Sequence, residues 1–343
     1  MAQAIFQFEE NMGGYLPEND GIDRYYLLVK QAGWRMPDNR MQNNWLWRQY
    51  MEKGALDKYV QIEARGQLAL QKRIENRLAL AIEQGDSDAA IIDCLDWLGH
   101  RGEETPEMVC LREEAGRLGE ESNDLFGVRN TGYFNLKHDF IGLGWIERQL
   151  EKAQEAKGRK RSDLLRQIAF YEDAGEGGFY DNAGSLNGAP HLVNGTQFDQ
   201  GQPFWPGALS ESNRPSQRLM AFTAHEKQCV TFQYDDLDPK ASYRVRFTLV
   251  RPRYQERYAM RMHQKSESIY ADDFLLAKDL ELPEYECEFF EFDVPKRATH
   301  DGELTIRFEK DPDIGEGKRT EVEIWRNCGG WGTLVSEVWL TKK

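Results

Sequence analysis

The chain has 343 residues, of which 40% are hydrophobic and 30% are charged, and its formal net charge is −14. This composition excludes a disordered or membrane-embedded protein. The acidic balance also argues against nucleic acid or an anionic membrane as partner, because both attract an excess of Lys and Arg.

The length exceeds that of a typical single core and predicts two domains. Residues 1–10 lack the basic start and apolar run of a signal peptide, and no run of about 18 apolar residues occurs, so no membrane insertion is expected. The chain is therefore expected to be cytoplasmic, or extracellular or periplasmic if an export signal has been removed, or a piece of a longer protein. Five scattered cysteines show no zinc-binding spacing.

The first half reads as an α-helical domain over residues 1–174. Apolar side chains recur there every three to four positions. Thr105 is expected to cap a helix whose first residue is Pro106. A basic run at residues 157–161 is expected to be a solvated turn. The spacing predicts helices over residues 21–33, 37–51, 56–83, 88–98, 106–126, 145–157 and 161–174.

Residues 129–144 interrupt the helical pattern with charged groups among aromatic residues and glycines. Such a segment serves either as a loop that satisfies its own polar groups or as a cleft lining. In the second case Tyr133 and Lys137 would flank His138 and Asp139. His138 could then exchange protons near neutral pH.

A glycine-rich stretch at residues 175–178 marks the start of a second domain, 175–343. Residues 179–206 are rich in Gly, Asn, Asp and Pro, which predicts a long irregular loop. Short segments with alternating apolar residues then follow, and this pattern favours an antiparallel β-sandwich. The expected strands are residues 218–224, 228–234, 242–250, 273–276, 286–294, 303–309, 321–325 and 333–340. The whole chain is thus predicted to be α+β, with helices first and the sandwich second.

Three features of the second half resemble galactose-binding-like β-sandwich modules, the jelly-roll group that includes discoidin domains and many carbohydrate-binding modules. They are the Gly-rich loop, the turn Leu237-Asp238-Pro239 leading into Tyr243-Arg244-Val245-Arg246, and the closing strand Val335-Ser336-Glu337-Val338-Trp339-Leu340. The chain as a whole also resembles poorly characterised bacterial proteins that accompany polysaccharide breakdown. These resemblances imply a glycan or polysaccharide partner and a secreted protein.

The resemblance further implies a structural calcium ion, held between an early loop and a carboxylate on the last strand. The matching positions are Asp181, Asn182 and Glu337. Calcium prefers several oxygen ligands of this kind. The alternative is that residues 181–184 form an ordinary turn and that Glu337 faces solvent.

Candidate glycan-binding residues are aromatic rings that could stack on a sugar and Arg forks that could pair with an acidic one. The basic run at residues 251–265 supplies most of them, although it could equally pair with the protein's own carboxylates. The candidates are Phe204, Trp205, Arg251, Arg253, Tyr254, Arg257, Tyr258 and Trp331.

Three functions remain open from the sequence. The first is glycan binding without catalysis. The second is a glycoside hydrolase or polysaccharide lyase with a cleft between the two domains. The catalytic candidates for this enzyme are His138, Asp139, Tyr180 and His191. The third is a structural or assembly protein that uses Trp-rich loops as partner surfaces. The sequence contains no GxSxG, HExxH, P-loop or GxGxxG motif, which argues against the common hydrolase, metalloprotease and nucleotide-binding chemistries.

Overall fold

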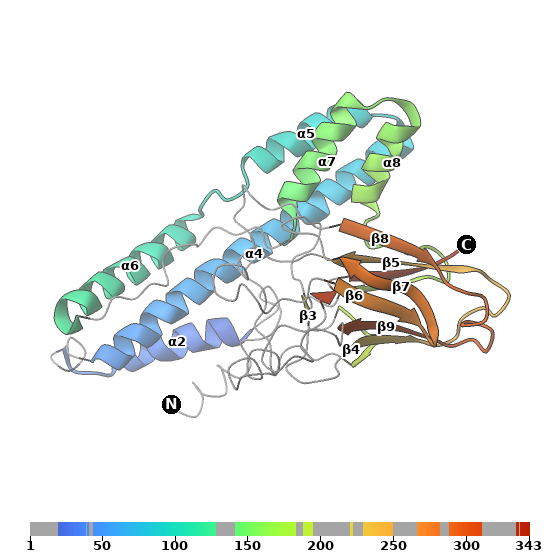
Figure 1. The fold of residues 1–343 in the computed structure, drawn as a ribbon. Coiled ribbons are helices and arrows are strands. Elements are labelled where there is room, and N and C mark those ends of the chain that lie inside the picture. The colour runs from blue at the N-terminus through green and yellow to red at the C-terminus, as the bar shows by residue number, and fades with distance from the viewer. Residues whose placement is uncertain are drawn as a thin grey trace. The chain divides into compact units, whose positions relative to one another are not determined.

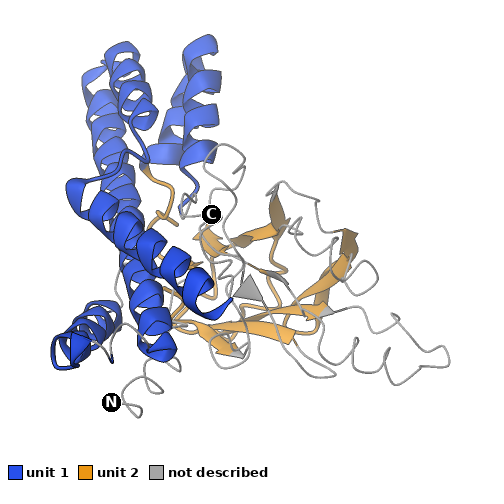
Figure 2. Ribbon diagram, turned by 90° about the vertical axis from the view of Figure 1, so that its left-hand side faces the viewer, with its two compact units in different colours: residues 1–169, 207–212 blue, residues 170–206, 213–343 orange. Residues whose placement is uncertain are grey.

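The structure is a computed structural model. It describes residues 20–38, 40, 44–127, 141–182, 188–194, 220–221, 229–249, 266–281, 288–310, 334–335 and 337–343. The chain divides into two compact units, shown in Figure 2. Unit 1 comprises residues 1–169 and 207–212, and unit 2 comprises residues 170–206 and 213–343. The boundary between the two units therefore lies at Phe170. The sequence predicted it a few residues later, at the glycines that begin at Gly175.

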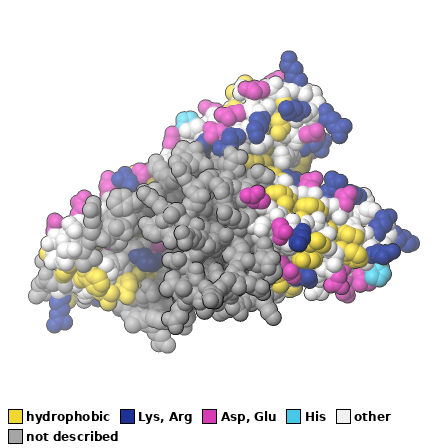
Figure 3. Space-filling view, viewed as in Figure 1, with side chains coloured by type: hydrophobic (Ala, Val, Ile, Leu, Met, Phe, Trp, Pro, Cys, Tyr) yellow, Lys and Arg dark blue, Asp and Glu magenta, His cyan; other side chains and the backbone are white. Residues whose placement is uncertain are grey.

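The described elements of unit 1 are helices, and those of unit 2 are antiparallel strands, so the chain is α+β (Figure 1). Acidic and basic side chains are interspersed on the described helices, as Figure 3 shows. The helices are α2 (Gly21–Trp34), α4 (Trp45–Gln84), α5 (Ser87–Gly99), α6 (Pro106–Phe126), α7 (Leu143–Glu155) and α8 (Gly158–Ala169).

Helix α4 runs unbroken for 40 residues, although the sequence predicted two separate helices here. The expected interruption coincides with Gly54. A Cβ atom at this position would lie 3.1 Å from the ring of Tyr25 on α2, so the glycine allows α2 and α4 to approach closely. Gly54 thus serves helix packing and does not end the helix.

The start of α6 confirms the expected cap. The Thr105 side chain accepts a hydrogen bond from the Met108 amide at 3.2 Å, and Pro106 occupies the first helical position. The basic run at residues 157–161 was predicted wrongly as a turn, because α8 already begins at Gly158.

Unit 2 contains a four-stranded sheet with the order β1-β11-β5-β8 and a five-stranded sheet with the order β2-β4-β9-β6-β7. A further pair, β3 with β10, forms a short ladder. The strands are β1 (Phe179–Asn182), β2 (Leu192–Asn194), β3 (Met220–Ala221), β4 (Cys229–Tyr234), β5 (Tyr243–Leu249), β6 (Ser266–Ala271), β7 (Phe274–Glu281), β8 (Glu288–Asp293), β9 (Leu304–Lys310), β10 (Leu334–Val335) and β11 (Glu337–Lys342).

Side chains from both larger sheets share one hydrophobic core. Phe247 of β5 packs edge-to-face on Phe308 of β9, with 5.0 Å between ring centroids. On its own sheet Phe247 stacks with Phe290 and Phe292 of β8. The alternation of apolar side chains along β4, β5 and β9 therefore places their apolar faces inward, as the period of two predicted.

The sequence missed three strands, β1, β2 and β6. Strands β1 and β2 are four and three residues long and lie within the stretch that was expected to be an irregular loop. The alternation of apolar and polar residues that predicts a strand must extend over several residues to be recognised, and these two strands are too short for it. Strand β6 lies beside the basic run and was not anticipated.

Candidate functional site

Strand β1 carries polar side chains on both faces of the four-stranded sheet. Successive residues of a strand point to opposite faces. Asp181 lies opposite Val338 of β11, whose side chain belongs to the core. Tyr180 and Asn182 lie opposite Trp339 and Glu337 and therefore share the other face with them. This second face, which carries Arg244, Arg246 and Thr248 of β5 as well, is called the outer face below.

Asp181 lies on the core side and is fully buried. Its carboxylate accepts hydrogen bonds from the His191 amide at 3.1 Å, from His191 Nδ1 at 3.0 Å and from the Tyr234 hydroxyl at 3.0 Å. Tyr234 belongs to β4 of the five-stranded sheet, so the carboxylate links the two sheets. Burial raises the pKa of Asp181, and the hydrogen bonds from His191 and Tyr234 oppose that rise.

His191 has a fixed ring orientation. Its Nδ1 edge faces Asp181, and its ring packs against Phe179 at 4.9 Å and Tyr234 at 4.8 Å between centroids. Its side chain is 24% exposed. Because Nδ1 faces the carboxylate, Nε2 lies on the opposite edge of the ring. An imidazole oriented in this way by a carboxylate can accept or donate a proton at Nε2.

Glu337 occupies the outer face and is 1% exposed. It accepts hydrogen bonds from the hydroxyl groups of Tyr171 and Tyr180, both at 2.7 Å, and from Thr248 Oγ1 at 3.4 Å. Burial raises the pKa of Glu337 to about 7, and the neighbouring charge of Glu172 acts in the same direction. The three hydroxyl donors favour the ionised form and limit the rise.

Aromatic rings surround Trp339 next to Glu337. The rings of Tyr180, Tyr171 and Phe289 lie 5.2, 5.3 and 5.9 Å from Trp339 between centroids. The guanidinium group of Arg246 lies over Phe289 at 3.9 Å and over Trp339 at 5.1 Å. Such stacking of Arg on aromatic faces is favourable, because the ring face is electronegative. We call Tyr180, Phe289 and Trp339 the aromatic platform.

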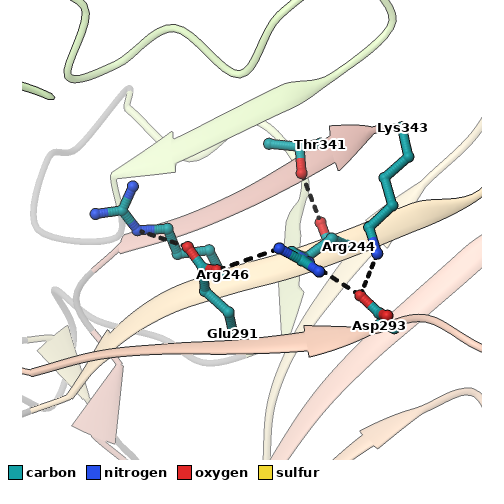
Figure 4. Close-up of polar contacts among 6 residues, drawn as sticks. All are labelled: Arg244, Arg246, Glu291, Asp293, Thr341 and Lys343. Atoms are coloured by element: carbon teal, nitrogen blue, oxygen red, sulfur yellow. Dashed lines mark hydrogen bonds and ion pairs between the residues drawn. The ribbon is translucent and has the colours of Figure 1, made fainter. Parts of the chain in front are cut away.

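Charged side chains continue the outer face beyond the aromatic platform (Figure 4). Arg246 pairs with Glu291 at 3.7 Å, and Arg244 pairs with Asp293 at 2.9 Å and with Glu291 at 3.5 Å. Asp293 also pairs with Lys343. This end of the face is open, since the Arg244 and Glu291 side chains are 42% and 47% exposed. This end of the outer face therefore presents guanidinium groups and carboxylates next to the aromatic platform.

The structure brings together four of the residues that the sequence singled out, in two separate clusters. His191 joins Asp181, and Tyr180 joins Glu337. The remaining catalytic and sugar-binding candidates lie outside the described residues: His138, Asp139, Phe204, Trp205, Arg251, Arg253, Tyr254, Arg257, Tyr258 and Trp331.

The residues implied for a calcium ion do not fit a shared site. Asp181 and Glu337 project from opposite faces of the same sheet, so one ion cannot contact both carboxylates. Each carboxylate is also occupied by three hydrogen-bond donors of the protein. Within the described ranges there is no group of three or more His, Cys, Asp and Glu side chains that could hold a metal ion. The alternative interpretation of residues 181–184 as a turn is also wrong for Asp181 and Asn182, which belong to β1.

Sequence reasoning missed Tyr171, Tyr234, Arg246 and Phe289. The alternation of Arg244 and Arg246 with buried Val245 and Phe247 could have placed both arginines on one exposed face. No sequence signal indicates that Tyr171 reaches Glu337, which lies 166 positions further along the chain.

No protein-family model and no curated protein matched this chain. Of the helices in the described residues, none combines the length and the apolar character needed to cross a membrane.

Proposed function

We propose that unit 2 is a β-sandwich of the galactose-binding-like type and that it binds a glycan on the outer face of its four-stranded sheet. Two antiparallel sheets with a common core support the sandwich. The observation that carries glycan binding is Arg246, which lies over Phe289 and beside Glu291 on the outer face, next to the end of that face where Arg244 and Glu291 are exposed. Sugars are held in this way, by an apolar ring against the pyranose face and by planar polar groups against the hydroxyls.

The ion pairs at the open end of the face suit a carbohydrate better than a nucleic acid. Arg244 and Arg246 alternate with the carboxylates of Glu291 and Asp293, so the face offers both donors and acceptors to hydroxyl groups. A uronic acid or sulfated sugar could in addition pair with an Arg fork.

Binding can be tested by calorimetric titration of the full chain with neutral cello-, xylo- and manno-hexaose and with acidic hexagalacturonate. We expect Phe289→Ala to weaken binding of the responding sugar about tenfold, because it removes a stacking ring worth roughly 1 kcal/mol or more. Arg246→Lys should weaken it less, since Lys keeps the charge and loses the planar fork.

The matched control is Arg307→Ala. Arg307 lies over Tyr270 at 4.9 Å and contacts Glu309, so it forms a comparable Arg, ring and carboxylate group on the other sheet. This substitution should leave the affinity unchanged. Loss of binding in Arg307→Ala with full binding in Phe289→Ala would move the site to the five-stranded sheet, and no binding to any hexasaccharide would contradict the proposal.

The Asp181 and His191 pair favours a second candidate, a carbohydrate-active enzyme. A buried carboxylate that holds Nδ1 of a partly exposed imidazole and leaves Nε2 on the opposite edge of the ring is the arrangement of a proton-transferring His. Incubation with a polysaccharide panel and assay of reducing ends and unsaturated products would test it. We expect activity to disappear in His191→Ala and to persist in the control His300→Ala, an exposed His on a turn. Equal activity of His191→Ala and wild type would exclude this role for His191.

A further inference from the structure

A five-residue segment between α8 and β1, residues 170–174, lies against the outer face and is called the strap. Its own backbone forms a local turn, in which the Asp173 amide donates to the Phe170 carbonyl at 3.2 Å. The Asp173 side chain closes the end of the turn by accepting from the Gly175 amide at 2.8 Å. These bonds shape the strap without pairing it to a strand of the sheet.

One residue of the strap, Tyr171, makes several contacts with the sheet. Its hydroxyl donates to Glu337, and its carbonyl accepts from the Trp339 indole at 3.0 Å. Its ring meets Trp339 at 5.3 Å and Phe289 at 6.4 Å, edge-to-face in both cases. Side-chain contacts of this kind can break while the strands keep their ladder hydrogen bonds.

The surface beneath Tyr171 is the aromatic platform. Trp339 is only 2% exposed, and among the described residues whose rings contact it, Tyr171 comes from the strap while Tyr180 and Phe289 come from the sheet. A sugar that stacked on Trp339 or Phe289 would need space next to these rings that Tyr171 and the guanidinium group of Arg246 occupy. The strap and a stacked ligand therefore compete for the same apolar surface.

We propose that the strap is an autoinhibitory cover, which closes the aromatic platform in the free protein and is displaced when a ligand stacks there. The opening of the strap is a property of the fold alone, and only the identity of the displacing ligand rests on the proposed glycan binding. A cover of this kind lowers the apparent affinity by the fraction of molecules that are closed.

Hydrogen exchange of the full chain without ligand tests the strap directly. We expect amides of residues 170–174 to exchange at least tenfold faster than those of β11, because local opening breaks the Tyr171 contacts and leaves the ladder hydrogen bonds of β11 intact. Tyr171→Phe keeps the ring and removes the hydroxyl that reaches Glu337. It should speed exchange of the strap about tenfold further and leave β11 unchanged.

The matched control is Tyr243→Phe, which removes the hydroxyl that accepts from the Asp238 amide elsewhere in unit 2. It should not alter exchange of the strap. Protection of the strap equal to that of β11, or equal acceleration of β11 by Tyr171→Phe, would show that Tyr171 is an integral part of the core and overturn the proposal.

The hexasaccharide titrations then test the competition. Tyr171→Ala should bind the responding sugar about tenfold more tightly than wild type, and saturation with that sugar should speed exchange of the strap in wild type. Weaker binding by Tyr171→Ala, or slower exchange of the strap on saturation, would contradict the cover. Absence of binding in every variant would reject the glycan and the competition, while the ligand-free exchange still decides whether the strap opens.

Discussion

At the scale of single residues, Glu337 links protonation to the stability of unit 2. Its carboxyl group is buried among Tyr171, Tyr180 and Thr248, and burial raises its pKa from the ordinary 4.5 to about 7. The folded state therefore holds a proton that the unfolded state releases between pH 4.5 and 7. Stability from this group is complete below pH 4.5, falls as the pH rises to about 7 and stays low above it.

We predict that Glu337→Gln removes this pH dependence. The amide oxygen still accepts from the tyrosines and carries no charge, so the variant should be more stable than wild type at pH 8. The shift of the pKa corresponds to a difference on the order of 3 kcal/mol. Urea unfolding of both proteins from pH 4.5 to 8.5 measures it, with the exposed Glu291→Gln as control. A variant less stable than wild type at pH 8 would show that the ionised carboxylate is needed.

At the scale of elements, long periodic segments were predictable and short ones were not. Helix α6 was expected with its cap and both ends, because Thr105, Pro106 and the apolar spacing act locally. The continuity of α4 was missed because two helices, 37–51 and 56–83, were predicted where one helix runs through. Gly54 lies in the expected gap, and its packing against the Tyr25 ring on α2 depends on a contact that the sequence does not show. The residues of the candidate site could be predicted from the sequence only in part. His191, Tyr180, Asp181 and Glu337 were all named from the sequence, but in other combinations. The pairing of Tyr180 with Glu337 joins residues 157 positions apart, and no local pattern in the sequence indicates it.

The cap of α6 gives a prediction at this scale. Thr105→Ala removes the acceptor for the Met108 amide and should destabilise unit 1 by about 1 kcal/mol. Thr105→Ser keeps a hydroxyl acceptor and serves as the control. Urea unfolding followed by helical circular dichroism measures the effect, and equal midpoints for the Ala and Ser variants would count against the cap.

At the scale of the whole molecule, the position of the boundary between the units has a measurable consequence. The sequence placed it at Gly175, whereas the contacts place residues 170–174 in unit 2. A fragment of residues 175–343 loses Tyr171, which leaves Glu337 without one hydroxyl donor and the Trp339 indole without its carbonyl acceptor. A buried acceptor that loses its partner costs roughly 1 to 3 kcal/mol, and the lost ring contacts add to that cost.

We therefore predict that a fragment of residues 170–343 unfolds at a higher temperature than a fragment of residues 175–343. For a unit of this size the difference should be several degrees, since 1 kcal/mol corresponds to roughly 2 to 4 °C. Scanning calorimetry measures it, and a 170–343 fragment carrying Tyr171→Ala separates the side chain from the chain length, because it should melt close to the shorter fragment. Equal melting temperatures for the three fragments would show that residues 170–174 do not stabilise unit 2 and would place its boundary at Gly175. Failure of the longest fragment to unfold cooperatively would mean that unit 2 needs the rest of the chain to fold.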